Sequence, residues 1–469
     1  MVIREIRNIP LPINRLPPEI LAEVLQYREN EIGLVAATHV CRYWRSCLSS
    51  TPSLWTNFCS KNFDLARVYL ERCKSAPISI RIPITSDPSL FKHIVHTAAR
   101  VGSVCLHGPY YVVIQWLLDI DKPLLSLRSL ELSVSPVLPS DGAQTLPSGF
   151  LALQAIFLRS LVLRGLYLPT HVPLPNLSIL ILQPYKSTVP LRLSSVFASL
   201  SQAQNLRELH LFIRECPFSI NSEVVTLGHL EHFRLVVDGT SPIHTLSLLR
   251  LPRLRSLTLR VAPYMNSPNF TLANCLPPNC CLSLMDVDQM LYEVNTVAPS
   301  SRVVTFSTQS LTVAVSVYPN ARGTIHDLAF KGWLSDTSPV SLARIKLAEI
   351  SGLPDLGEIP FTAFEDLEVL RLRGSGHIGT LVALSPRSAN GFVPCPRLRT
   401  LDVRWEYDLD ALELLHLVNL ARERMAEGNP FDDVCVGGAV VYQSSLFEEL
   451  RGYVGNLDLS RVVEEAEGS

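Results

Sequence analysis

The stretch INRLPPEILAEVLQYRENEIGLVAATHVCRYWRSCLSSTPSLWTNF, from Ile13 to Phe58, is rich in large apolar residues for its length. Pro17 and Pro18 suit the first turn of a helix, because the N–H groups that proline lacks have no partner inside the helix there. Apolar residues then recur at helical spacing, so the sequence predicts a helix with a wide apolar stripe. The stripe consists of Leu16, Ile20, Leu21, Val24 and Leu25.

A second apolar stripe follows in the same stretch. It consists of Val35, Val40, Trp44 and Leu48, with Trp55 beyond Pro52. About 45 residues cannot enclose two tryptophans and this many aliphatic side chains unaided. The surplus must therefore face either the rest of the chain or another protein.

Three short motifs in this stretch resemble the F-box. They are Leu-Pro-x-Glu-Ile-Leu at Leu16–Leu21, Val-Cys-Arg-x-Trp at Val40–Trp44 and Pro-x-Leu-Trp at Pro52–Trp55. The connection Gln26–Leu34 departs from the family pattern. The resemblance implies a helical F-box domain, placed at residues 10–58, that docks on the Skp-type adaptor of an SCF ubiquitin ligase and reaches a cullin through it. An ordinary helical hairpin at the start of a globular domain is the alternative.

The resemblance also implies which side chains face the adaptor. These are Leu16, Pro17, Ile20, Leu21, Val24, Val40, Trp44 and Trp55. Part of this surface, on the side of Trp44 and Trp55, is also expected to seat the domain on the rest of the chain.

The bulk composition narrows the class of protein. Apolar residues make up 47% of the 469 residues and charged residues 18%, yet no run approaches the roughly 18 apolar residues of a membrane span. A net charge of −2 predicts neither nucleic acid nor a membrane surface as partner. The eleven cysteines show no paired spacing for a disulfide framework or a zinc site. With no signal-peptide pattern at the start, we expect a cytosolic or nuclear protein without a metal or cofactor.

A Leu-x-x-Leu-x-Leu pattern returns through the rest of the chain at intervals of roughly 19 to 31 residues, which bracket the length of a leucine-rich repeat. The last two apolar residues of each copy alternate as in a short strand with one buried face. Such strands bury their leucines only against the next unit, so the units stack into a solenoid. A general α/β protein with parallel strands is the alternative. The copies start at Leu127, Leu158, Leu177, Leu206, Leu230, Leu254, Leu342, Leu367 and Leu398, with degenerate copies at Val101 and Ile325.

The predicted fold class is therefore α/β, with an N-terminal helical F-box followed by an irregular leucine-rich-repeat solenoid. After the F-box come a helical linker with the first solenoid strand at 59–100, the solenoid at 101–405 with an insert near 260–324, and a C-terminal helical cap with an acidic tail at 406–469. Single elements are also expected: a helix over Phe63–Cys73, strands over Ile78–Ile82 and Leu311–Val317, helices over Leu409–Met425 and Phe447–Val454, and a loop over Gly428–Asp433.

Motifs that would indicate catalysis are weak. Arg373-Gly-Ser-Gly-His377 places a serine near a histidine, but it lacks the Gly-x-Ser-x-Gly order of a nucleophile elbow and follows a predicted strand, so we interpret it as a turn. His93 and His96 lie one helical turn apart without a third metal ligand. We therefore expect no enzyme.

The later repeats carry arginines at positions that should face out from the sheet. Arg371 and Arg373 project from one face beside Arg404, and Arg260 holds a similar place in an earlier unit. Guanidinium groups pair bidentately with carboxylates and phosphates, so these four residues are candidates for binding a target with an acidic or phosphorylated segment. A merely solvated strand face is the alternative.

The resulting hypothesis is a substrate-recognition subunit of an SCF-type ubiquitin ligase, which holds an unknown target protein close to the transfer machinery without an active site of its own. The rival hypotheses are a scaffold protein that does not feed a ligase and, more remotely, a hydrolase-like enzyme.

Overall fold

The structure is a computed structural model of the whole chain. It describes residues 12–26, 31–59, 63–83, 100–120, 123–135, 144–169, 172–183, 193–214, 224–238, 243–262, 289–294, 302–308, 312–317, 342–351, 359–374, 377–385, 393–405, 411–440 and 444–464. No helix in these ranges has both the length and the apolar character that a membrane crossing requires.

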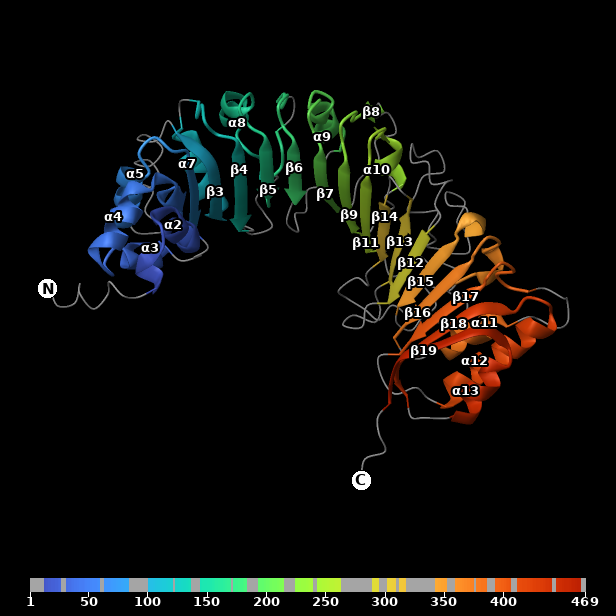
Figure 1. The fold of residues 1–469 in the computed structure, drawn as a ribbon. Coiled ribbons are helices and arrows are strands. Elements are labelled where there is room, and N and C mark those ends of the chain that lie inside the picture. Colours follow the sequence, from blue (N-terminus) through green and yellow to red (C-terminus); the bar gives the residue numbers. More distant parts are fainter. Residues whose placement is uncertain are drawn as a thin grey trace. The chain divides into compact units, whose positions relative to one another are not determined.

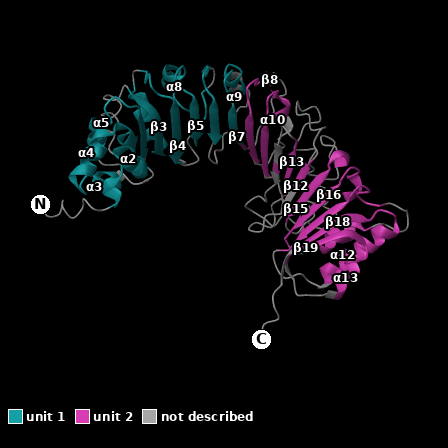
Figure 2. Ribbon diagram, in the orientation of Figure 1, with its two compact units in different colours: residues 1–212 teal, residues 213–469 magenta. Residues whose placement is uncertain are grey.

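The chain divides into two compact units (Figure 2). Unit 1 covers Met1–Phe212 and unit 2 covers Ile213–Ser469. Each is described separately below.

Unit 1 begins with three short helices, α2 (Pro18–Gln26), α3 (Glu31–Ala37) and α4 (Arg42–Ser50). The 3-10 helices η1 (Pro12–Arg15) and η2 (Pro52–Trp55) flank them. The start of α2 confirms the prediction from the proline pair. Pro18 is its first residue, and the carbonyl of Pro17 accepts the N–H of Leu21 at 3.0 Å. Leu21, Leu25, Leu48 and Trp55 are buried and form the core of this helical module.

The rest of unit 1 is a ladder of parallel strands that pair in chain order (Figure 1). The strands are β1 (Asn57–Phe58), β2 (Ile78–Pro83), β3 (Val101–Pro109), β4 (Ser129–Ser135), β5 (Ser160–Arg164), β6 (Ile179–Gln183) and β7 (Glu208–Arg214). The connections contain α5 (Phe63–Arg72), α7 (Tyr110–Leu118), α8 (Ser148–Gln154) and α9 (Leu193–Leu200). The helix and strand expected between residues 63 and 83 are thus confirmed as α5 and β2.

The repeated Leu pattern sets the register of this ladder. Leu130 of β4 lies opposite Leu161 of β5, which lies opposite Leu180 of β6 and then Leu209 of β7. Each of these leucines is fully buried. Because strand side chains alternate between the two faces, the intervening residues lie on the opposite, more exposed face.

A backbone contact recurs at the start of several repeats of the two ladders. The carbonyl of Arg128, one residue after the first apolar position, accepts the N–H groups of Arg159 and Ser160 at 2.8 and 2.9 Å. Arg159 holds the same position in the next repeat as Arg128 does in its own, and Ser160 follows it. A main-chain bond of this kind aligns neighbouring units whatever their side chains are. The same double acceptor occurs at Arg159, Ser178, Glu231, Lys346, Glu368 and Arg399.

Unit 2 contains a second ladder whose order in space differs from the order in the chain. The order is β9 (His232–Asp238), β11 (Ser256–Ala262), β14 (Thr312–Val317), β13 (Arg302–Ser307), β12 (Gln289–Val294), β15 (Leu347–Ser351), β16 (Val369–Arg373), β17 (Thr400–Arg404), β18 (Phe431–Val440) and β19 (Val454–Glu464). A small separate sheet pairs β8 (Val225–Thr226) with β10 (Leu249–Arg250), and α10 (Ile243–Ser247) precedes β10.

The described strands of the region expected as an insert, β12, β13 and β14, form an antiparallel meander inside this ladder. β14 pairs with β13 and β13 with β12 in antiparallel fashion, whereas the outer contacts β11–β14 and β12–β15 are parallel. Two reversals restore the strand direction, so the ladder continues into β15 without interruption. The strand expected over Leu311–Val317 is confirmed as β14.

The repeat expected to start at Leu342 has a different frame. Ala348 and Ile350 of β15 lie opposite Leu370 and Leu372 of β16, and both are buried, whereas Leu347 is only half-buried. Ile345 therefore takes the first apolar position, and Leu342 belongs to the 3-10 helix η6 (Leu342–Arg344). A second 3-10 helix, η7 (Phe361–Ala363), precedes β16. The degenerate copy at Ile325 lies outside the described residues.

The C-terminal part is not a purely helical cap. The helix expected over Leu409–Met425 is confirmed as α12 (Ala411–Ala426), and α11 (Ile378–Leu384) precedes it. The helix expected over Phe447–Val454 is confirmed only as far as Arg451, as α13 (Ser444–Arg451), because Val454 begins β19. Between and after them, however, β18 and β19 extend the parallel ladder. The loop expected over Gly428–Asp433 is wrong from Phe431 onward, and the tail expected to fray from Val462 forms part of β19 as far as Glu464.

Candidate functional site

The helical module of unit 1 exposes several of the side chains expected to face an adaptor. Ile20 and Val24 lie one turn apart on α2 and are 43% and 47% exposed, and Val40, between α3 and α4, is 51% exposed. Pro17 is exposed as well. Burial of large aliphatic side chains lowers the free energy, so this exposed apolar surface is suited to contact another protein.

Leu16 and Trp44, two further predicted adaptor residues, lie where hydrogen bonds join α4 to η1 and to the residue that follows it. The indole Nε1 of Trp44 donates to Oδ1 of Asn14 at 2.6 Å, and the Tyr43 hydroxyl donates to the carbonyl of Leu16. Leu16 and Trp44 are half-buried. These bonds hold the chain before α2 against α4, so both side chains have a fixed place next to the exposed surface.

The remaining two predicted adaptor residues, Leu21 and Trp55, are fully buried within the chain. The Trp55 indole donates to the carbonyl of Leu48 at 2.8 Å, and its ring meets the Tyr69 ring edge-on with 5.0 Å between centroids. The Arg72 guanidinium lies 4.4 Å from the ring centroid. Trp55 thus joins the helical module to α5, and neither it nor Leu21 is part of the exposed surface.

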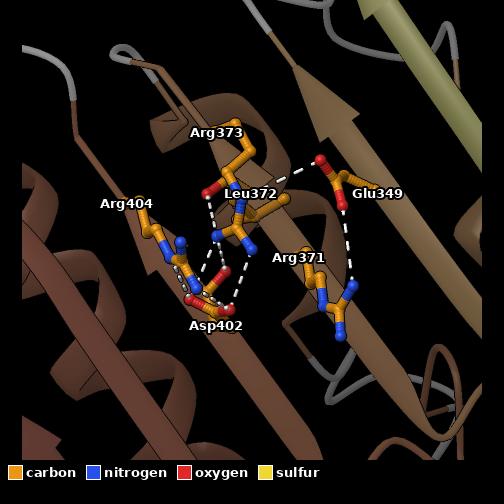
Figure 3. A network of polar contacts seen from close by, with 6 residues as sticks. All are labelled: Glu349, Arg371, Leu372, Arg373, Asp402 and Arg404. Carbon is orange, nitrogen blue, oxygen red and sulfur yellow. Dashed lines mark hydrogen bonds and ion pairs between the residues drawn. The ribbon is translucent and has the colours of Figure 1, made fainter.

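Three of the four arginines expected to bind a target, Arg371, Arg373 and Arg404, lie in a charge network on unit 2 (Figure 3). Arg373 donates to both carboxylate oxygens of Asp402 at 3.0 and 2.8 Å, and Arg404 bonds the same carboxylate at 3.2 Å. Glu349 lies on the other side, with its oxygens 3.8 Å from Arg371 and 3.9 Å from Arg373. The sequence pattern placed the three arginines together but missed the two acids that pair with them.

This pairing changes what the arginine group can do. Three cations and two anions leave a small net positive charge, and Arg373 is mostly shielded, whereas Arg371 and Arg404 are about 40% exposed. The fourth candidate, Arg260, lies on β11 and is separated from β16 by β14, β13, β12 and β15. At about 4.8 Å per strand, it is roughly 24 Å from the others along the sheet.

Asp402 is the centre of the network. Burial favours a higher pKa, but hydrogen bonds and charge from Arg373, and then from Arg404, outweigh it and hold the pKa of Asp402 below its ordinary 3.8. A carboxyl whose pKa is lower in the folded state stabilises the fold above its unfolded pKa of about 3.9, and this contribution is lost as the pH falls through the folded value.

We therefore expect Asp402→Asn to destabilise unit 2 by about 1–3 kcal/mol at neutral pH, because two guanidinium groups lose their shared carboxylate. The difference from the wild type should shrink as the pH falls below about 4. Urea denaturation at a series of pH values measures this. A difference in stability that does not depend on pH between 6 and about 3 would contradict the assigned role of the carboxylate.

Two residues of the Arg373-Gly-Ser-Gly-His377 motif, Gly374 and His377, lie within the described residues on either side of its centre. Gly374 has a φ of 100°, which suits glycine, and its N–H donates to the carbonyl of Arg404 at 2.9 Å. His377 immediately precedes α11 and is fully buried, and burial lowers its pKa to about 4. Ser375, His93 and His96 lie outside the described residues.

The comparison with known families agrees with the sequence motifs. Residues 13–61, about a tenth of the chain, match the F-box-like family model. The chain therefore carries an F-box-like domain, which supports its assignment as an F-box protein. No curated protein sequence matches the chain.

Proposed function

We propose that this protein is the substrate-recognition subunit of an SCF-type ubiquitin ligase. The observation that carries the proposal is the exposed apolar surface of the F-box-like domain, centred on Ile20, Val24 and Val40. F-box domains in general bind Skp-type adaptors. An adaptor docked on this surface would link the chain to a cullin.

The remainder of the chain serves, in this proposal, as the target-binding part. We interpret its two ladders as an irregular leucine-rich-repeat solenoid. The recurring buried leucines, the parallel pairing and the repeated double acceptor at the start of several repeats support this interpretation. A protein of this kind contributes proximity: it raises the effective concentration of the target at the ligase and requires no reactive group of its own.

The test replaces Ile20 and Val24 together by alanine. Truncating two central aliphatic contacts of an interface should weaken adaptor binding at least about tenfold. The matched control is Val382→Ala with Leu415→Ala, because these side chains are 47% and 40% exposed and lie on α11 and α12 of unit 2. The measurement is co-purification of a Skp-type adaptor with each variant, together with its far-ultraviolet circular dichroism.

Adaptor recovered at the wild-type level with the Ile20/Val24 variant would reject this surface. If the adaptor binds through this surface but no specific protein accumulates in cells that lack the chain, the proposed receptor function is wrong. The chain is then a scaffold protein that does not feed a ligase.

A further inference from the structure

Three exposed arginines lie along the edge of unit 1 at which the strands begin. Arg128, Arg159 and Arg207 hold the same position, directly after the first buried leucine, in the units of β4, β5 and β7, and Ser178 holds it in the unit of β6. Main-chain hydrogen bonds link these positions in sequence. We call these four residues the arginine edge. At about 4.8 Å per strand, it is roughly 15 Å long.

The arginine edge lacks acidic partners in the described part of unit 1. Arg128 donates to the carbonyls of Leu125 and Phe157, and no described acid pairs with Arg159 or Arg207. Two acids on the sheet face have partners of their own: Glu131 pairs with Arg164 at 2.5 Å, and a carboxylate oxygen of Glu208 lies 3.0 Å from Nε2 of His210. Like charges in a row without neutralising groups create a positive potential that attracts anions.

The equivalent positions of unit 2 show that this arrangement is not a property of the repeat itself. There the position is filled by three acidic and three basic residues: Glu231, Arg255, Lys346, Glu368, Arg399 and Asp432. Arg399 pairs with Asp432 at 3.3 Å, and the nearby Arg397 pairs with Asp366 at 2.8 Å. The edge of unit 2 therefore carries charges of both signs and, at Arg399, a neutralising ion pair, whereas the charged residues of the arginine edge are all positive.

Apolar side chains accompany these charges. Leu125 and Ile156 each precede an arginine of the edge by three residues and are 59% and 64% exposed. The turns that carry them are held by side chains: Gln154 Oε1 accepts the N–H of Leu124 at 2.8 Å, and Asn176 donates to the carbonyl of Ile156 at 2.8 Å. A surface held in place before binding loses little conformational freedom when a ligand docks.

We propose that the arginine edge binds an extended acidic peptide segment that carries aliphatic residues between its carboxylates. Guanidinium groups pair bidentately with carboxylates, and Leu125 and Ile156 offer contact area to aliphatic side chains. A length of roughly 15 Å fits four or five residues of extended chain. The inference rests on the proposed function where it assigns this segment to a target protein, and it places the charge recognition on unit 1 and not on the arginines of unit 2 that pair with Glu349 and Asp402.

The experiment measures binding of a fluorescein-labelled peptide of about eight residues, alternating Glu and Leu, to the full chain with its adaptor by fluorescence anisotropy. Arg159→Gln with Arg207→Gln should raise the Kd about tenfold or more. The matched control, Arg397→Gln with Arg399→Gln, removes the same charge from the same edge of unit 2 and should change the Kd less than about twofold. Replacing Glu by Gln in the peptide, or raising the salt concentration, should also weaken binding.

Failure of the wild type to bind this peptide would overturn the inference. An equal loss of affinity in Arg159→Gln/Arg207→Gln and in Arg397→Gln/Arg399→Gln would also overturn it, because it would indicate nonspecific charge attraction. If a single-stranded RNA of equal charge binds more tightly than the peptide, the proposed acidic peptide is wrong and the ligand of the arginine edge is nucleic acid. The Ile20→Ala/Val24→Ala variant separates the two proposals: it should lose the adaptor and keep the peptide. If the wild type binds the adaptor but not the peptide, only the arginine edge is rejected. If the Ile20→Ala/Val24→Ala variant still binds the adaptor, only the docking surface is rejected.

Discussion

Replacing Trp55 by alanine is expected to destabilise unit 1 by about 3–5 kcal/mol, because a fully buried tryptophan leaves a large cavity. The effect should reach beyond the helical module. Trp55 contacts Tyr69 of α5, whose ring also meets Phe58 of β1, and β1 pairs with β2. The loss should therefore loosen the connection between the module and the ladder.

Guanidinium denaturation followed by tryptophan fluorescence and circular dichroism measures this loss. Trp55→Phe is the control, because it keeps an aromatic ring in the core while it removes the hydrogen bond to the carbonyl of Leu48 and part of the ring volume, at a smaller cost of about 1–2 kcal/mol. A decrease below about 1 kcal/mol for Trp55→Ala would contradict the assigned role as the joint of unit 1.

The second large effect is expected for Arg424→Ala in unit 2. The Arg424 side chain is fully buried on α12 and donates to three carbonyls, those of Pro394, Cys395 and Leu398, at 2.9, 3.1 and 3.3 Å. Its guanidinium also lies 5.0 Å from the centroid of the Phe431 ring. Removing it leaves buried acceptors without donors, and we expect a loss of about 3–5 kcal/mol.

The cost of this substitution is raised by the segment that Arg424 holds. Cys395 has a φ of 48°, a left-handed conformation that a non-glycine residue adopts only where neighbouring contacts fix it. Burial raises the pKa of the Cys395 thiol to about 12, so the thiol stays neutral beside the guanidinium. The segment leads into β17, and its loss should loosen the end of unit 2.

The control lies two residues away on the same helix. Arg422 pairs with Glu449 at the surface, and an exposed ion pair contributes little to stability. Arg422→Ala should therefore leave the unfolding midpoint of unit 2 nearly unchanged when both variants are measured by urea denaturation. Equal midpoints for the two variants would show that Arg424 does not secure the segment.

The sequence predicted most of the regular ladder, since buried leucines at fixed spacing are what parallel strands of this kind require. It failed where the leucines are replaced. Ala348 holds a core position next to Ile350, so the larger Leu342 and Leu347 suggested a wrong frame. β18 contains Gly437 and Gly438, which interrupt the apolar alternation, although the backbone there approaches Trp405 too closely for any side chain at Gly438.

The candidate site was predictable in part. Motif spacing located the exposed Ile20, Val24 and Val40, but the burial of Leu21 and Trp55 depends on contacts with residues far along the chain, such as Tyr69. The pairing of Arg373 with Asp402 has a similar cause. The two residues are 29 positions apart and meet only because β16 and β17 lie in register.

The main-chain carbonyl that accepts two N–H groups of the next repeat affects which substitutions the ladder tolerates. Alignment between neighbours is transmitted through main-chain atoms that every amino acid possesses, so substitutions on the outward face need not disturb the stacking. Repeats of unequal length, with 19 residues from Ser160 to its partner Ile179 and 31 residues from Ser129 to its partner Ser160, are tolerated for the same reason. The outward face of the ladder can therefore vary in sequence while the main-chain contacts between neighbouring repeats persist.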